Sequence, residues 1–166
     1  MTDSTWPLAA WLETTSISLW VRESLYGFSI VVAVHILSLM LSVGTIVWFD
    51  LRLIGVSMLR VPVSRLYRRL MPWTLAGFAL MFTSGGILLA AYATKAFDNM
   101  YFRTKMVALL LAGVNALVYH AVTERGIVNW DTAIRPPASA RAAGLISIVV
   151  WTTVIIAGRM MSYTMF

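Results

Sequence analysis

The chain has 166 residues, of which 60% are hydrophobic and 12% charged, and its mean hydropathy is +0.80. A soluble domain carries about 25% charged residues, so this composition excludes a soluble protein and predicts one embedded in a membrane. Because the chain has no cysteine, disulfides, iron–sulfur clusters and thiolate ligands are excluded as well. The net charge of +6 comes from basic residues between apolar runs, which favours anionic lipid headgroups over nucleic acid as their partner.

The first predicted element is a short helix lying in the membrane interface. The stretch WPLAAWLETT places Trp6, Leu8, Trp11 and Leu12 where they can share one apolar face. The acidic start of the chain and the full spanning length of the apolar run that follows argue against a signal peptide.

Four apolar stretches follow, each long enough to cross a bilayer, which takes about 20 residues. They cover roughly residues 24–49, 73–97, 104–122 and 142–165. Pro72 precedes the second stretch, and proline suits the first turn of a helix. The sequence therefore predicts an all-α fold, a transmembrane four-helix bundle forming a single domain over residues 1–166.

Two connections between the spans differ in character. The segment 51–72 carries five arginines among apolar residues, so it is predicted to include an amphipathic surface helix. Residues 123–141 contain Pro136 and Pro137 and are predicted to form an irregular loop.

The distribution of Lys and Arg predicts the orientation. These two connections hold eight basic residues, namely Arg52, Arg60, Arg65, Arg68, Arg69, Arg125, Arg135 and Arg141. The other side holds five, namely Arg22, Lys95, Arg103, Lys105 and Arg159. The positive-inside rule then puts the eight in the cytoplasm and both termini on the periplasmic side of a bacterial inner membrane.

The chain has two histidines, His35 and His120, and both fall inside predicted spans. An ionisable residue inside a membrane is costly, which makes each a candidate for function. His35 lies about 16 Å below the outer end of its span and His120 about 24 Å below that of a parallel span. Two imidazoles on parallel helices at comparable depth predict the axial ligands of one haem iron.

Several alternatives remain open for these polar residues. Each histidine could hydrogen-bond across a helix interface, and Arg159 could bind a haem propionate or extend to the outer headgroups. Copper handling is a second hypothesis, with the histidines joined by thioethers from the spans, namely Met40, Met81, Met106, Met160 and Met161. A membrane anchor subunit without a cofactor is the third.

Other polar residues are interpreted as structural. Asp50 is expected to form an ion pair with Arg52 or with Arg68 or Arg69. Asn115 is expected to bond to a neighbouring helix, and the glycines of the second span to mark close packing.

Several motifs resemble those of a family of small, uncharacterised bacterial four-helix integral membrane proteins. The matching stretches are VVAVHILSLMLSVG, FDLRLIG, PWTLAGF, TSGG and FRTKMVALLLAGVNALVYH. At a coarser level the chain is similar to cytochrome b561-type and copper-resistance-type membrane domains. The b561 resemblance implies haem between helices, although those proteins generally use four histidines and this chain has two.

The function predicted from the sequence is electron transfer by a cytochrome b. One haem b per chain is expected, with His35 and His120 as iron ligands and Arg159 as a propionate partner. The expected partners are the lipid bilayer and a quinone or redox protein, within a homo-oligomer or a larger complex. Because GxGxxG, Walker A and HExxH motifs are all missing from the sequence, any chemistry is expected to come from a cofactor.

Overall fold

The computed structural model describes residues 6–165, and these residues contain helices and no strand. Four helices are long and apolar enough to cross a membrane, with mean hydropathy between 1.7 and 2.4. They are α3 (Gly27–Ile54), α4 (Val63–Ala91), α7 (Ala138–Met165) and the run Met100–Asn129, which begins with α6 (Met100–Val118). The predicted all-α membrane fold is confirmed.

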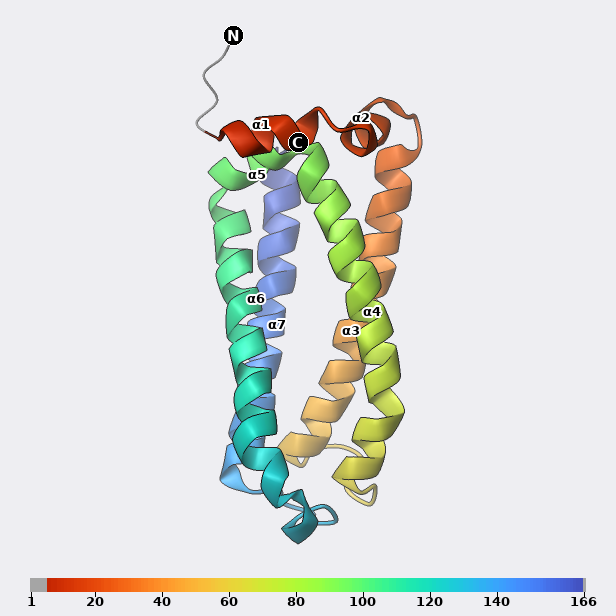
Figure 1. Ribbon diagram of the computed structural model, residues 1–166. Helices are drawn as coiled ribbons and strands as arrows, with labels where there is room; N and C mark the ends of the chain where they lie inside the picture. The colour runs from red at the N-terminus through yellow and green to blue at the C-terminus, as the bar shows by residue number, and fades with distance from the viewer. Residues whose placement is uncertain (1–5, 166) are drawn as a thin grey trace.

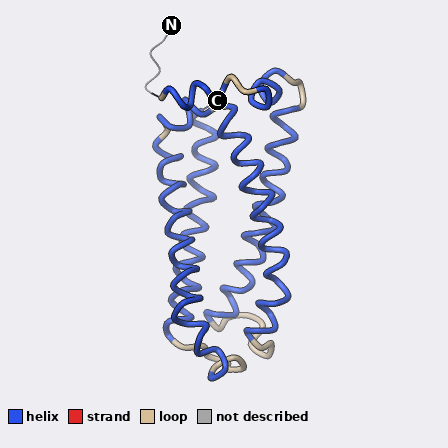
Figure 2. The backbone as a smooth tube through the Cα atoms, in the orientation of Figure 1, coloured by secondary structure: helices blue, strands red, loops and turns tan. Residues whose placement is uncertain are grey.

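The long helices run side by side, and shorter helices lie across one end of the bundle (Figure 1). We call this the terminal end. It carries α1 (Pro7–Glu13), α2 (Ser16–Glu23), α5 (Ala93–Asp98) and the last turn of α7. The opposite, loop end carries the α3–α4 connection and the segment before α7 (Figure 2). The short helix predicted within residues 6–15 is present as α1, where Trp11 is 63% exposed, and α2 is a second short helix that was not predicted.

The order of packing around the bundle determines where the site can form. Helix α3 packs against α4 and α7, and α7 packs against α6, whereas α4 and α6 are not a closely packed pair. Helices α3 and α4 approach closely, because a Cβ atom on Gly77 would lie 2.8 Å from the backbone nitrogen of Ser42. A glycine at this position lets the two backbones approach, as small residues do between membrane helices.

Three predicted boundaries around α3 and α4 are wrong. The predicted span 73–97 is divided, because α4 ends at Ala91 and α5 forms a separate short helix after it. Helix α3 continues beyond residue 49 to Ile54 and ends at Gly55, whose φ of 85° suits a glycine after a helix. Residues 63–72, predicted to belong to a surface helix, are the first turns of α4, and Pro72 lies inside that helix. A proline removes only one backbone hydrogen bond, so a long helix held by its neighbours continues through it.

The predicted loop at residues 123–141 is only partly correct. Helix α6 continues as a π-helical turn, η1 (Tyr119–Thr123), and a 3₁₀ helix, η2 (Glu124–Asn129). Irregular backbone is limited to residues 130–137, where Pro136 and Pro137 immediately precede α7. The π turn matters for the site because it carries His120.

A buried arginine holds the loop end together. The Arg52 side chain is fully buried and donates hydrogen bonds to the carbonyl oxygens of Val61 (2.9 Å), Ala133 (3.1 Å) and Asp131 (3.4 Å). It therefore joins the end of α3 to the start of α4 and to the segment before α7. The predicted ion pair between Asp50 and Arg52 is wrong, since neither of the two salt bridges found among the described residues involves Asp50.

Asp131 caps the start of α4 from a distant part of the chain. Its carboxylate accepts hydrogen bonds from the Ser64 backbone N–H (2.7 Å) and the Ser64 hydroxyl (2.8 Å). Burial acts to raise the pKa of Asp131, but these bonds and the charges of Arg52 and Arg68 together hold that pKa below its ordinary value. The carboxylate is thus the ionised cap that a helix N-terminus favours.

Candidate ligand-binding pocket

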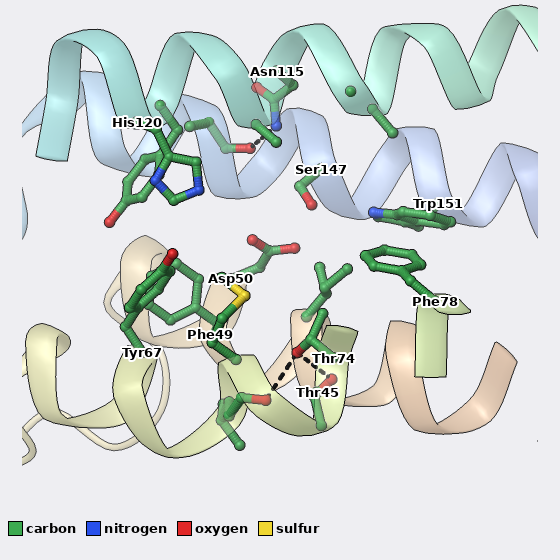
Figure 3. A pocket seen from close by; sticks show the side chains of 18 of the residues that line it. Thr45, Phe49, Asp50, Tyr67, Thr74, Phe78, Asn115, His120, Ser147 and Trp151 are labelled. Carbon is green, nitrogen blue, oxygen red and sulfur yellow. Dashed lines mark hydrogen bonds between the residues drawn. The ribbon is translucent and has the colours of Figure 1, made fainter. Parts of the chain in front are cut away.

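A pocket of about 370 Å³ lies between the four long helices, in the half of the bundle nearer the loop end (Figure 3). This volume is within the range of small-molecule sites, roughly 300–1,000 Å³. All four spanning helices contribute to its wall, and most of the wall comes from α4 and α6. The lining is mainly aliphatic and aromatic, with a few polar groups that converge on one part of it.

His120 lines the pocket from the π turn at the end of α6. Its Nδ1 forms a hydrogen bond with the Glu124 carboxylate one turn later. The rings of Tyr67 and Tyr119 pack edge-on against the imidazole, with centroids 5.7 Å and 5.4 Å away. A carboxylate on Nδ1 makes this nitrogen the donor, so Nε2 is the nitrogen that remains for a ligand.

Asp50 provides a second polar group in the same part of the pocket. Its side chain is buried, and the carboxylate atom Oδ2 has no hydrogen-bond partner among the described residues. The Ser147 hydroxyl faces the carboxyl group from α7 (Figure 3). A buried carboxyl oxygen without a partner is costly, and at the wall of a pocket it is available to bind a ligand.

The pocket becomes apolar toward the terminal end of the bundle. Phe78 on α4 and Trp151 on α7 stack with ring centroids 5.5 Å apart, and Phe82 and Leu109 lie at the same end. Between the two ends, the hydroxyls of Thr45 and Thr74 bond to each other at 2.8 Å. The pocket therefore has a hydrogen-bonding end and a hydrophobic end, as Figure 3 shows from left to right.

Asn115 lies in the wall of the pocket but is occupied by the protein itself. Its side-chain amide donates to the Ala143 carbonyl on α7 at 3.0 Å, which confirms the predicted bond to a neighbouring helix. This bond helps to place α7 beside α6 at the level of the pocket.

His35 lies elsewhere, in the half of α3 nearer the terminal end. Its Nδ1 lies 3.1 Å from the Met81 carbonyl oxygen and 3.0 Å from the Ser84 hydroxyl on α4. The Ser84 hydroxyl itself donates to the Leu80 carbonyl at 2.6 Å, so the imidazole N–H is the donor in the bond to Ser84. His35 thus forms a hydrogen bond across the α3–α4 interface, which is the structural role that the sequence left open for it.

The structure does not bring His35 and His120 together. His35 does not line the pocket, whereas Asp50, which follows it on the same continuous helix, does. Asp50 comes fifteen positions after His35, which corresponds to about 22 Å along α3. Two axial ligands of one iron need both imidazoles at one level of the bundle, and these two rings lie at different levels.

The other predicted site residues are also separate from the pocket. Arg159 is exposed on α7 near the terminal end, where it donates to the Tyr163 hydroxyl at 3.1 Å and lies 4.8 Å from the centre of that ring. Of the methionines considered for copper, none lines the pocket. Within residues 6–165, no group of three His, Asp or Glu side chains is arranged to hold a metal ion.

Sequence reasoning missed Glu124, Tyr67 and Tyr119 as parts of the site and treated Asp50 as structural. One signal was available, since a histidine and a glutamate four residues apart share a helix face. Tyr67 carried no such signal, because it comes from α4 and meets His120 only in the folded bundle. Tyr119 directly precedes His120 in the sequence, but only the structure shows its ring packed against the imidazole.

The fold and pocket define a multi-pass α-helical membrane protein with a small-molecule cavity between its spans. Residues 10–164 match a family described as "Family of unknown function (DUF6644)", and the chain belongs to this family. No curated protein and no solved structure matches the chain.

Proposed function

We propose that this membrane protein binds a lipid-soluble quinone in the pocket, with the quinone ring at the hydrogen-bonding end. The observation that carries the proposal is the polarity of the pocket. His120 with Glu124 and the unpartnered oxygen of Asp50 lie at one end, and Phe78, Phe82 and Trp151 lie at the other. A quinone has the matching shape, a flat ring with two carbonyl oxygens and an apolar tail.

The protein's side chains can bind both faces and edges of such a ring. When both ring nitrogens of His120 carry a proton, Nδ1 would donate to Glu124 and Nε2 to one carbonyl oxygen of the quinone. The rings of Phe49, Tyr67 and Tyr119 surround this end and offer flat surfaces for stacking. Asp50 would accept a hydrogen bond from a quinol hydroxyl, which makes the reduced form a ligand as well.

A titration with decylubiquinone tests this function. We expect saturable quenching of tryptophan fluorescence in the purified protein, reduced in a Trp151→Phe variant because Trp151 lines the pocket. His120→Phe should weaken binding about 10- to 100-fold, the effect of losing a charge-assisted hydrogen bond. His35→Gln, outside the pocket, should bind as the wild type does. Quenching that is linear and equal in all four proteins would show partitioning into detergent and contradict the proposal.

The second candidate ligand is haem b, the cofactor expected from the sequence. It is favoured by the Glu124 carboxylate on His120 Nδ1, because histidines that bind metals commonly donate their other N–H to a carboxylate. The residues present fit one protein ligand to such an iron, at Nε2 of His120. Bound haem would supply one-electron transfer. The resemblance to cytochrome b561-type domains that the sequence suggested, and a role in electron transfer, would belong to this candidate.

An absorbance spectrum separates the two candidates. If haem b is bound, we expect a Soret band in protein expressed with added haem precursor, lost in His120→Ala and retained in His35→Ala. Loss of the band in both variants would instead support the predicted pair of axial histidines. A colourless protein that still binds decylubiquinone would leave the quinone as the ligand.

We also propose an orientation of the bundle in the membrane. The eight basic residues counted in the two connections lie at the loop end, so we place this end in the cytoplasm of a bacterial inner membrane. The hydrogen-bonding end of the pocket then lies nearer the cytoplasm, and both termini lie on the periplasmic side. A redox partner or a second copy of the chain would meet the bundle from these surfaces.

A further inference from the structure

The pocket reaches the lipid-facing surface between α4 and α6. These two helices form most of its wall but are not a closely packed pair. Leu75 and Phe82 on α4 line the pocket and are nevertheless 59% and 58% exposed. Gly113 and Ala116 on α6 also line it and are exposed. Because all four positions lie within spanning helices, this opening faces the hydrocarbon of the bilayer.

The edges of the opening differ in size. Bulky side chains on α4 stand beside small residues on α6, and a Cβ atom added to Gly113 would have no atom within 4 Å. The described side chains thus leave a slot beside Gly113 that the protein does not fill.

The loop end of the pocket is closed by contrast. Leu53, Val63, Tyr119 and Ala140 form a buried apolar cluster there. Ile127 and Trp130 pack against this cluster from the segment that follows the π turn. A water-soluble ligand would have to displace this cluster, whereas a lipid-soluble one meets an open slot.

We infer that the slot between α4 and α6 holds the apolar tail of the ligand, which enters sideways from the bilayer. This inference rests on the proposed function and adds the position of the tail. The ring lies by His120 and Asp50, and the tail passes between Leu75 and Gly113 to the lipid. Tail contacts, and not only ring contacts, therefore contribute to affinity.

Filling the slot tests the inference. Gly113→Phe puts a large side chain into the space beside α4, and the matched control is Gly86→Phe, an exposed position on α4 where an added Cβ also has no atom within 4 Å. Gly86 does not line the pocket. Each protein is titrated with decylubiquinone and with the same quinone ring lacking the decyl tail.

We expect Gly113→Phe to lose at least about tenfold in affinity for decylubiquinone, while the tail-free ring binds within about twofold of the wild-type affinity. Gly86→Phe should bind both compounds as the wild type does. Unchanged decylubiquinone affinity in Gly113→Phe, or equal losses for both compounds, would overturn the placement of the tail. Failure of the wild type to bind either compound would instead overturn the proposed function, so the two failures are distinguishable.

Discussion

Replacing Arg52 by methionine is expected to destabilise the protein by about 3–5 kcal/mol. The methionine keeps much of the volume but removes every donor, which leaves the carbonyls of Val61, Asp131 and Ala133 without the partner they now share. These carbonyls belong to two segments of the chain and Arg52 to a third, so the loop end should loosen as a unit. In a protein of this size the loss corresponds to a fall in Tm of roughly 10 °C.

Thermal unfolding in detergent, followed by circular dichroism, measures this effect. Arg69→Met is the matched control, since Arg69 is exposed on α4 near the same end. It should change Tm by no more than about 2 °C. Equal stability of the two variants would show that the Arg52 hydrogen bonds contribute little, and would contradict the role given to this residue.

Replacing Gly77 by leucine is expected to separate α3 from α4. Even the first side-chain atom would lie 2.8 Å from the Ser42 backbone nitrogen and 2.9 Å from the Ser42 Cβ, and both belong to a rigid helix. Overpacking of this kind costs about 1–3 kcal/mol, and the cost rises when backbone must move. Because Thr74 and Phe78 flank Gly77 and line the pocket, the affinity for decylubiquinone should fall as well.

Gly86→Leu provides the comparison on the same helix. An added Cβ there has no atom within 4 Å, and replacing an exposed helical glycine gains up to about 1 kcal/mol. The control should therefore melt at the wild-type temperature or slightly above it. If Gly77→Leu melted with the control, the close approach of α3 and α4 at Ser42 would not be needed for the fold.

The apolar runs were sufficient to predict the spans, but not every boundary. A run of about 20 apolar residues must form a helix in lipid, because the backbone has no other hydrogen-bond partner there. Helix α4 extends ten residues before the predicted start at 73, because Asp131 caps its first turn from a distant segment. Sequence-local signals, such as Pro72 and a cluster of arginines, carry no information about such a partner.

The same difference between local prediction and tertiary contact applies to the functional residues. His120 was identified from the sequence because a histidine inside a span is costly and rare. The structure does not bring it together with His35, because depth measured from span ends ignores the actual start of each helix and the side each ring faces. Whereas His35 bonds to α4 near the terminal end, His120 bonds to Glu124 near the loop end.

The sequence by itself determined that this protein is a four-span helical bundle whose two histidines fall within the apolar runs and whose basic residues lie mainly between them. These properties follow from the composition and length of each segment, and each segment can be assessed without knowing its neighbours in the fold. Only the tertiary structure decided that Asp50, His120 and two tyrosines meet at one pocket, and that the pocket opens between α4 and α6. The reason is geometric, because contacts between helices depend on their rotation and order around the bundle.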